Sequence, residues 1–172
     1  RILKKAETAG QTRRMIEVLV LQALIFQGRK DLDQTLAALK KAVQMGLIGG
    51  LAPRFHGLPT NRSHRTTIDI DCVDLVERVV EDQADAAILV PNCPICHQSC
   101  ALAARALETA GIATVVMGAA LDIVEHVGVP RFLFSDFPLG NSAGRPNDPK
   151  SQDETLAMAR ALLEEASAPR TT

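Results

Sequence analysis

The stretch that decides the fold is DAAILVPN (residues 85–92), which runs directly into CPICHQSCALAARALETAG (residues 93–111). The first part is a short continuous apolar run, typical of a β-strand that is buried on both faces. The second part begins with a cysteine and a proline and ends at a glycine, which are signals of a helix start and a helix end. We therefore predict a buried strand followed by a helix.

The same order of strand and helix recurs toward the C-terminus. IATVVMG (residues 112–118) precedes AALDIVEHVG (residues 119–128), and PRFLFSDFPLG (residues 130–140) precedes DPKSQDETLAMARALLEEAS (residues 148–167). This alternation predicts parallel strands covered by helices on both faces. We expect one α/β domain over residues 1–172, a Rossmann-like three-layer sandwich with a mostly parallel sheet. Ligands of such sheets bind at the carboxyl ends of strands, where the strand order reverses.

The first 83 residues predict more helix than strand. QTRRMIEVLVLQALIFQG (residues 11–28) is apolar nearly all round at helical spacing. We predict an N-terminal apolar helix within residues 1–30 that packs on the core or forms an oligomer interface. Downstream we expect the following: an amphipathic helix over 32–45, a short strand in 47–52, an irregular polar segment over 53–67 and a helix over 71–83.

Charge and composition exclude several classes of protein. The net charge of -1 gives no field that would gather nucleic acid. The apolar run MIEVLVLQALIF (residues 15–26) is too short to span a bilayer, so we expect no membrane segment. Three of the four cysteines lie within eight residues, unlike the spread framework of a secreted disulfide scaffold. A cytoplasmic location is the prediction.

The cysteine cluster at residues 93–100 contains the candidate catalytic residues. We expect Asn92 or Cys93 at the helix cap with Pro94 in the first turn. This places the Cys93 sulfur where the helix dipole and free amides lower the pKa of a thiol. Cys96 lies one turn on, within reach for a disulfide. His97 follows and is predicted to transfer a proton. Cys100, on the same helix, is expected to be a core residue, as is Cys72.

A metal site would use the same atoms. Cys93, Cys96, His97 and Cys100 number four zinc-type ligands, but a closed site usually draws on two separated pairs, and the sequence has no second pair. We therefore predict no resident cofactor or metal, with zinc or an iron–sulfur cluster as the alternative.

Two further segments are predicted to line a substrate pocket. Arg54 and His56, in the irregular polar segment, are suited to hold an anionic group, with a solvated charged loop as the alternative. Asp136 and Asn141 lie in SDFPLGN (residues 135–141), which follows another predicted strand and so reaches the same edge of the sheet as the cysteines.

Five motifs in order resemble a known family: GLIGGLAPRFHG (46–57), DAAILVPNCPICHQSC (85–100), AGIATVVM (110–117), VPRFLFSDFPLGN (129–141) and GRPNDPKSQ (144–152). They resemble the B-component selenoprotein family of glycine, sarcosine and betaine reductase, particularly its small stand-alone relatives. The similarity covers about residues 36–165.

The resemblance implies a reductase or reductive lyase that cleaves a carbon–heteroatom bond of a small substrate. Cys93 matches the position that is often selenocysteine and would be the nucleophile, while Cys96 would be the resolving thiol. An external thiol reductant and a homodimer or a partner subunit are expected. The alternative is a noncatalytic partner subunit or metal-binding module of a larger reductase complex.

Overall fold

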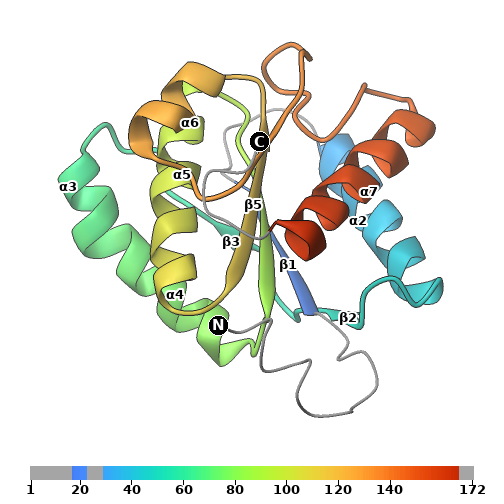
Figure 1. Cartoon of the computed structure of the whole chain (residues 1–172), viewed down its shortest axis with the longest axis horizontal. Helices are drawn as coiled ribbons and strands as arrows, with labels where there is room; N and C mark the ends of the chain where they lie inside the picture. Colours follow the sequence, from blue (N-terminus) through green and yellow to red (C-terminus); the bar gives the residue numbers. More distant parts are fainter. Residues whose placement is uncertain (1–16, 23–28, 167–172) are drawn as a thin grey trace.

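The computed structural model describes residues 17–22 and 29–166. In this part of the chain a parallel sheet lies between two layers of helices (Figure 1). The strands are β1 (Glu17–Gln22), β2 (Gly50–Leu51), β3 (His56–Gly57), β4 (Ala86–Val90), β5 (Ala113–Gly118) and β6 (Phe132–Phe134). The helices are α2 (Arg29–Gln44), α3 (His64–Thr66), α4 (Cys72–Glu81), α5 (Pro94–Thr109), α6 (Leu121–Val127) and α7 (Pro149–Glu165), with a π-helical turn η1 (Thr67–Asp71) between α3 and α4.

The strand order places the start of α5 at a reversal point of the sheet. The order is β2-β1-β4-β5-β6, and β3 also pairs with β1. Each described pairing is parallel. From β1 the chain moves outward to β2 and β3, then returns to the other side of β1 to form β4. Sheets of this doubly wound order bind ligands beside the carboxyl ends of the two strands at the reversal, here β1 and β4.

The predicted N-terminal helix is wrong where the structure describes it. Residues 17–22 form β1, which pairs with β4 on one side and with β2 and β3 on the other. A strand covered on both faces is apolar at successive positions, so EVLVLQ satisfies a central strand as well as it satisfies a buried helix. The rest of the predicted helix lies outside the described residues, as does most of the proposed interface over 1–30.

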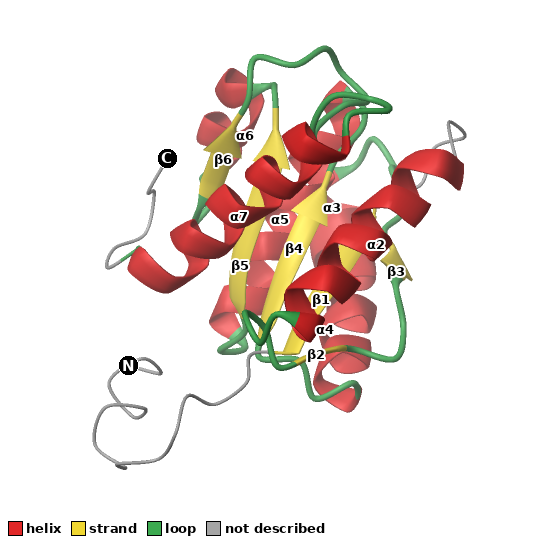
Figure 2. Ribbon diagram, turned by 90° about the vertical axis from the view of Figure 1, so that its right-hand side faces the viewer, coloured by secondary structure: helices red, strands yellow, loops and turns green. Residues whose placement is uncertain are grey.

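The core divides into two clusters, one on each face of the sheet. Ala87 and Leu89 of β4 belong to the cluster under α4, α5 and α6. Ala86, Ile88 and Val90 belong to the cluster under α2 and α7. Figure 2 shows α2 and α7 in front of the sheet, with α4 and α5 behind it. All five β4 side chains are therefore buried, which explains why this strand reads as an uninterrupted apolar run.

The edge of the sheet beside β1 is interrupted. β2 pairs with Glu17 and Val18, and β3 pairs with Leu21 and Gln22. The segment between them contains Pro53, which has no backbone N–H to donate to a ladder and is tolerated at such an edge. The predicted irregular segment over 53–67 therefore contains a short strand and the start of the α3–η1–α4 helix.

Candidate functional site

The first turn of α5 is built around the Cys93 side chain. Cys93 is the N-cap residue in an extended conformation (φ -138°, ψ 165°), and its Sγ accepts a hydrogen bond from the Cys96 N–H at 3.2 Å. Pro94 follows as the first helical residue, where its missing N–H costs nothing. Of the two predicted caps, Asn92 and Cys93, the structure has Cys93. This cap holds the Cys93 sulfur at the positive end of a 16-residue helix.

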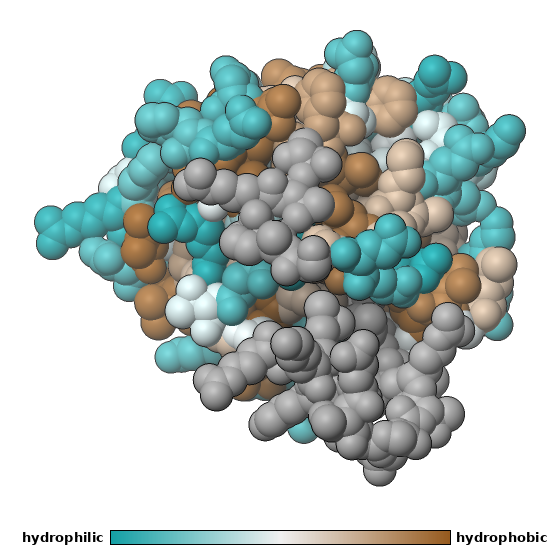
Figure 3. Space-filling model, viewed as in Figure 1, coloured by the Kyte–Doolittle hydropathy of each residue, from teal (hydrophilic) through white to brown (hydrophobic). Residues whose placement is uncertain are grey.

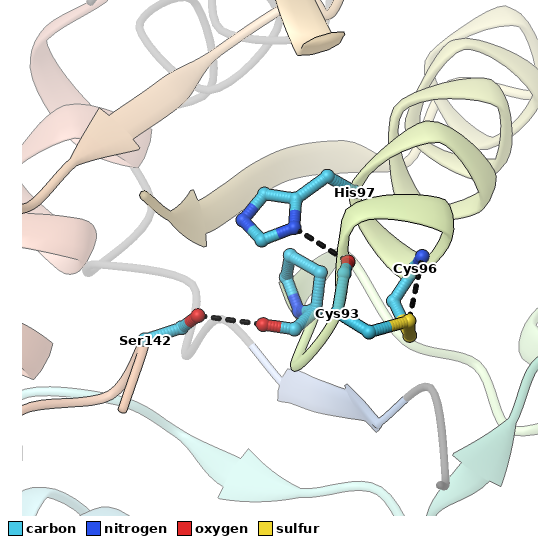
Figure 4. Close-up of a disulfide and its surroundings, with 5 residues drawn as sticks. Cys93, Cys96, His97 and Ser142 are labelled. Atoms are coloured by element: carbon cyan, nitrogen blue, oxygen red, sulfur yellow. Dashed lines mark hydrogen bonds between the residues drawn. A yellow bond between two sulfur atoms is a disulfide. The ribbon is translucent and has the colours of Figure 1, made fainter. Parts of the chain in front are cut away.

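Cys93 and Cys96 form a disulfide, with their Cα atoms 5.0 Å apart (Figure 4). Cys93 is half-buried, whereas Cys96 is fully buried. An incoming molecule can therefore reach the first sulfur more readily than the second. In the reduced state the Cys96 amide and the helix dipole are available to stabilise a Cys93 thiolate.

His97 lies with its imidazole between α5 and the end of β5, and both ring nitrogens have backbone partners. Nδ1 lies 2.8 Å from the Cys93 carbonyl oxygen, and Nε2 lies 3.1 Å from the Ala119 backbone nitrogen. The side chain is fully buried, and burial lowers the pKa of His97 below that of an exposed histidine, although the hydrogen bond to Cys93 opposes the shift. Proton transfer by His97 stays a prediction.

The loop after β6 reaches the cysteine turn through a serine. The Ser142 Oγ donates to the Pro91 carbonyl oxygen at 2.6 Å, and this serine is buried (Figure 4). Its neighbour Asn141 is half-buried, whereas Asp136, earlier in the loop, is exposed. The prediction that this loop reaches the same edge of the sheet is confirmed, but Ser142 itself was not foreseen. Nothing in its sequence context distinguishes it from Asn141.

Arg54 and His56 bind a carboxylate of the chain itself. Arg54 Nε lies 2.7 Å and His56 Nε2 lies 2.8 Å from the two oxygens of Asp82, and Arg54 also pairs with Glu81 at 3.0 Å. These bonds fasten the edge segment to the end of α4. Among the described residues, no hydrogen bond or ion pair joins Arg54 or His56 to Cys93. The roles of Arg54, His56, Asp136 and Asn141 in substrate binding stay predictions.

The remaining two cysteines are core residues, as predicted. Cys72 and Cys100 are free thiols and are almost completely buried in the cluster under α4 and α5. Burial raises the pKa of Cys72 to about 11 and the pKa of Cys100 to about 12. Thiols of such high pKa are almost wholly protonated at neutral pH and are poor nucleophiles.

A shallow groove of about 400 Å³ runs between α5 and α6. It is lined by Pro94, Ile95, Gln98, Asp122, Ile123, His126 and Val127. Neither Cys93 nor Cys96 lines it. Within residues 17–22 and 29–166, no group of three or more His, Cys, Asp or Glu side chains is arranged to hold a metal ion.

One curated protein resembles part of the chain. It is the D-proline reductase subunit gamma of Acetoanaerobium sticklandii, 33% identical over 79 residues. The match covers 46% of this chain and 33% of the relative, so the chain spans about a third of the length of the curated relative it matches. The relative is named as a reductase subunit, which supports the reductase resemblance but not the finer assignment to glycine, sarcosine or betaine reductase.

No protein-family model matches the chain. Among solved structures, the ABC transporter solute binding protein from Thermobispora bispora superimposes with a TM-score of 0.47 at 17% identity, over 91% of this chain and 51% of that chain.

None of the helices in the described residues has the length and apolar character needed to cross a membrane.

Proposed function

We propose that the chain is a cysteine-dependent reductase or reductive lyase that cleaves a carbon–heteroatom bond of a small substrate. The observation that carries the proposal is the Cys93–Cys96 pair at the carboxyl end of β4, with the first sulfur partly exposed and the second buried. The match to a reductase subunit supports the same class of reaction.

The reaction starts from the reduced dithiol. The Cys93 thiolate attacks a substrate carbon, a carbon–sulfur bond forms, and the heteroatom leaves with the electron pair of the broken bond. The Cys96 thiolate then attacks the Cys93 sulfur, so that the disulfide forms and the carbon leaves as a carbanion that takes up a proton. The substrate must therefore carry a carbonyl or iminium group beside the reacting carbon to stabilise this charge.

The two thiolates supply the two electrons of the reduction. In the products the reacting carbon carries a hydrogen in place of the heteroatom, and the heteroatom group is released. The disulfide is the oxidised end state of the cycle. An external dithiol reduces it by thiol–disulfide exchange, in which the partly exposed Cys93 sulfur is the accessible point of attack. No resident cofactor or metal takes part in the proposed cycle.

Trapping of the covalent intermediate tests this assignment. Reduced Cys96→Ser protein should accumulate an adduct on Cys93 when it is incubated with an α-halocarbonyl probe such as iodoacetamide. In Cys93→Ser, where Cys96 is the remaining thiol of the pair, labelling at position 96 should be much slower. Cys72→Ala serves as the control with the same number of thiols, because Cys72 is buried. Equal labelling of Cys93→Ser and Cys96→Ser, read by peptide mass spectrometry, would contradict the assigned roles.

The structure also favours assembly with another polypeptide as a second proposal. Four apolar side chains along η1 and α4 are 49–62% exposed, namely Ile68, Ile70, Val73 and Val80. On the face shown in Figure 3, hydrophobic residues reach the surface between hydrophilic ones. The matched relative is named as a subunit. A homodimer or a partner subunit would be detected by sedimentation, and a monomer that turns over substrate alone would exclude the need for either.

A further inference from the structure

We propose that His97 is a positioning residue, which acts in its neutral form to hold the N-terminal turn of α5 against the end of β5. The proposal rests on Cys93 being the reacting thiol. It assigns His97 a task different from the proton transfer that its sequence position predicts.

The hydrogen bonds define the tautomer of the imidazole. A backbone amide can only donate, so Nε2, which receives the Ala119 N–H at 3.1 Å, must present a lone pair. A carbonyl oxygen can only accept, so Nδ1, 2.8 Å from the Cys93 oxygen, must carry the proton. Protonation of Nε2 would place a donor against a donor. Both partners therefore favour one neutral tautomer.

The surroundings of the ring favour the same state. The side chain is 0% exposed, and removing a charged imidazolium from water is costly. The charge of Asp122, a residue exposed to solvent, raises the pKa of His97 less than burial lowers it. A ring that keeps both nitrogens engaged and stays neutral is poorly suited to carry a proton to substrate.

The ring can approach the strand because residue 118 has no side chain. A Cβ at Gly118 would lie 2.5 Å from His97 Nε2 and 2.7 Å from its Cδ2. Gly118 is also bound on its other side, since its carbonyl oxygen accepts the Ser135 N–H at 2.9 Å. The imidazole thus connects the cysteine turn to the point where β5 and the segment after β6 end.

This connection controls the geometry of Cys93. The Cys93 carbonyl oxygen accepts two bonds from the same residue, one from the His97 backbone N–H at 3.1 Å and one from Nδ1. Together they hold the extended N-cap conformation from which Sγ meets the Cys96 N–H. Loss of the ring would loosen the peptide that presents the thiolate to its stabilising amide.

The direct test is the tautomer of His97 in the reduced full-length chain. In two-bond proton–nitrogen NMR spectra of protein labelled with ¹⁵N-histidine, Nδ1 should be protonated and Nε2 unprotonated. This pattern should persist down to about pH 6.5, where an exposed histidine is half protonated. Either a ring that is half protonated there or the opposite tautomer would overturn the proposal. This measurement needs no variant.

Variants test the consequence for Cys93. In His97→Ala the pH midpoint of Cys93 alkylation should rise by about one unit, so that at a pH below both midpoints the alkylation rate falls about tenfold. His97→Gln should recover part of the rate, because its amide oxygen can accept the Ala119 N–H. His126→Ala is the matched control, since His126 is exposed on α6.

The outcomes separate the two proposals. An alkylation profile that loses an ionisation of histidine in His97→Ala, with the Cys93 midpoint unchanged, would show acid–base chemistry and overturn the positioning role. A wild-type Cys93 that is no more reactive than a free thiol would sink the proposed function, whereas the NMR pattern would still report on the tautomer.

Discussion

At the scale of single residues, the glycine at position 118 is required by space rather than by an unusual backbone angle. A Cβ there would lie at 2.5 Å from the His97 ring and 3.1 Å from Phe132 Cε2. We expect Gly118→Ala to lower the free energy of unfolding by about 1–3 kcal/mol, the usual range for an overpacked core site. Urea unfolding of the reduced protein measures this change.

A double-mutant cycle shows whether His97 is the cause. The ring is removed in His97→Ala, so the added methyl of Gly118→Ala should cost less in that background than in the wild type. Additive losses would mean that the clash with Phe132 or a backbone shift accounts for the effect. Gly128→Ala is a reference variant with a different cause of strain. A Cβ at Gly128 would meet open space, but the backbone there has a positive φ of 82°.

The helix start and the pair of Cys93 and Cys96 could be predicted from the sequence, because the residues that begin a helix follow local rules. A cap, a first-turn proline and a residue one turn on are all defined within four positions. The bonds of His97 could not be foreseen in the same way. Its Nε2 partner is 22 residues away in the chain, and the contact exists only once β5 lies beside β4.

At the scale of elements, the loop over 135–148 is fastened to the β4–α5 turn by Ser142. Ser142→Ala removes the donor to the Pro91 carbonyl, and loss of a bond to a buried acceptor costs about 1–3 kcal/mol. We expect faster amide hydrogen exchange in the loop and in the first turn of α5. Ser135→Ala is the control, because Ser135 Oγ makes only a long 3.5 Å contact with the Gly118 carbonyl oxygen. Equal exchange in both variants would contradict the fastening role.

The end of α4 depends on the ionised Asp82. Burial disfavours the charged form, but the hydrogen bonds from His56 and Arg54 outweigh it, so the pKa of Asp82 is lowered. The stability from this group is present above the unfolded pKa of about 3.9 and is lost as the pH falls through the lower folded value. Asp82→Asn should therefore be less stable than the wild type by about 1–2 kcal/mol at neutral pH.

Acid unfolding provides the check on Asp82. The difference between wild type and Asp82→Asn should shrink as the pH drops below about 4, where the wild-type carboxyl takes up its proton. Asp85→Asn, at an exposed position three residues away, should show little change at either pH. A stability difference for Asp82→Asn that does not depend on pH would mean that shape rather than charge maintains the contact.

The order of elements from residue 71 onward follows the sequence prediction, and β1 does not. Strands and helices alternate there with clear boundaries at Pro94, Gly111 and Gly128. The run EVLVLQ has no such boundary, and its apolar residues fit either element when both faces are buried. Pairing within the sheet favours the strand over the helix for this segment, because β1 gains hydrogen-bonded neighbours on both sides.

At the scale of the whole molecule, the four thiols should fall into two classes. Cys93 and Cys96 become reactive when their disulfide is reduced, whereas Cys72 and Cys100 are enclosed between α4 and α5. We expect an aromatic disulfide reagent to release two equivalents of its thiolate from reduced native protein, one when Cys93 attacks the reagent and one when Cys96 displaces the mixed disulfide on Cys93. In denaturant four equivalents should be released. Four fast thiols in the native protein would show that the core between α4 and α5 opens readily.

The most direct measurement is the rate of Cys93 alkylation against pH in reduced protein of known metal content, resolved by peptide mass spectrometry. We predict a midpoint well below about 8.5, the value for a free cysteine. Cys96 should react more slowly, because it is fully buried. A Cys93 with an ordinary midpoint, or one that reacts only after a chelator removes bound metal, would contradict the claim that this residue is the nucleophile.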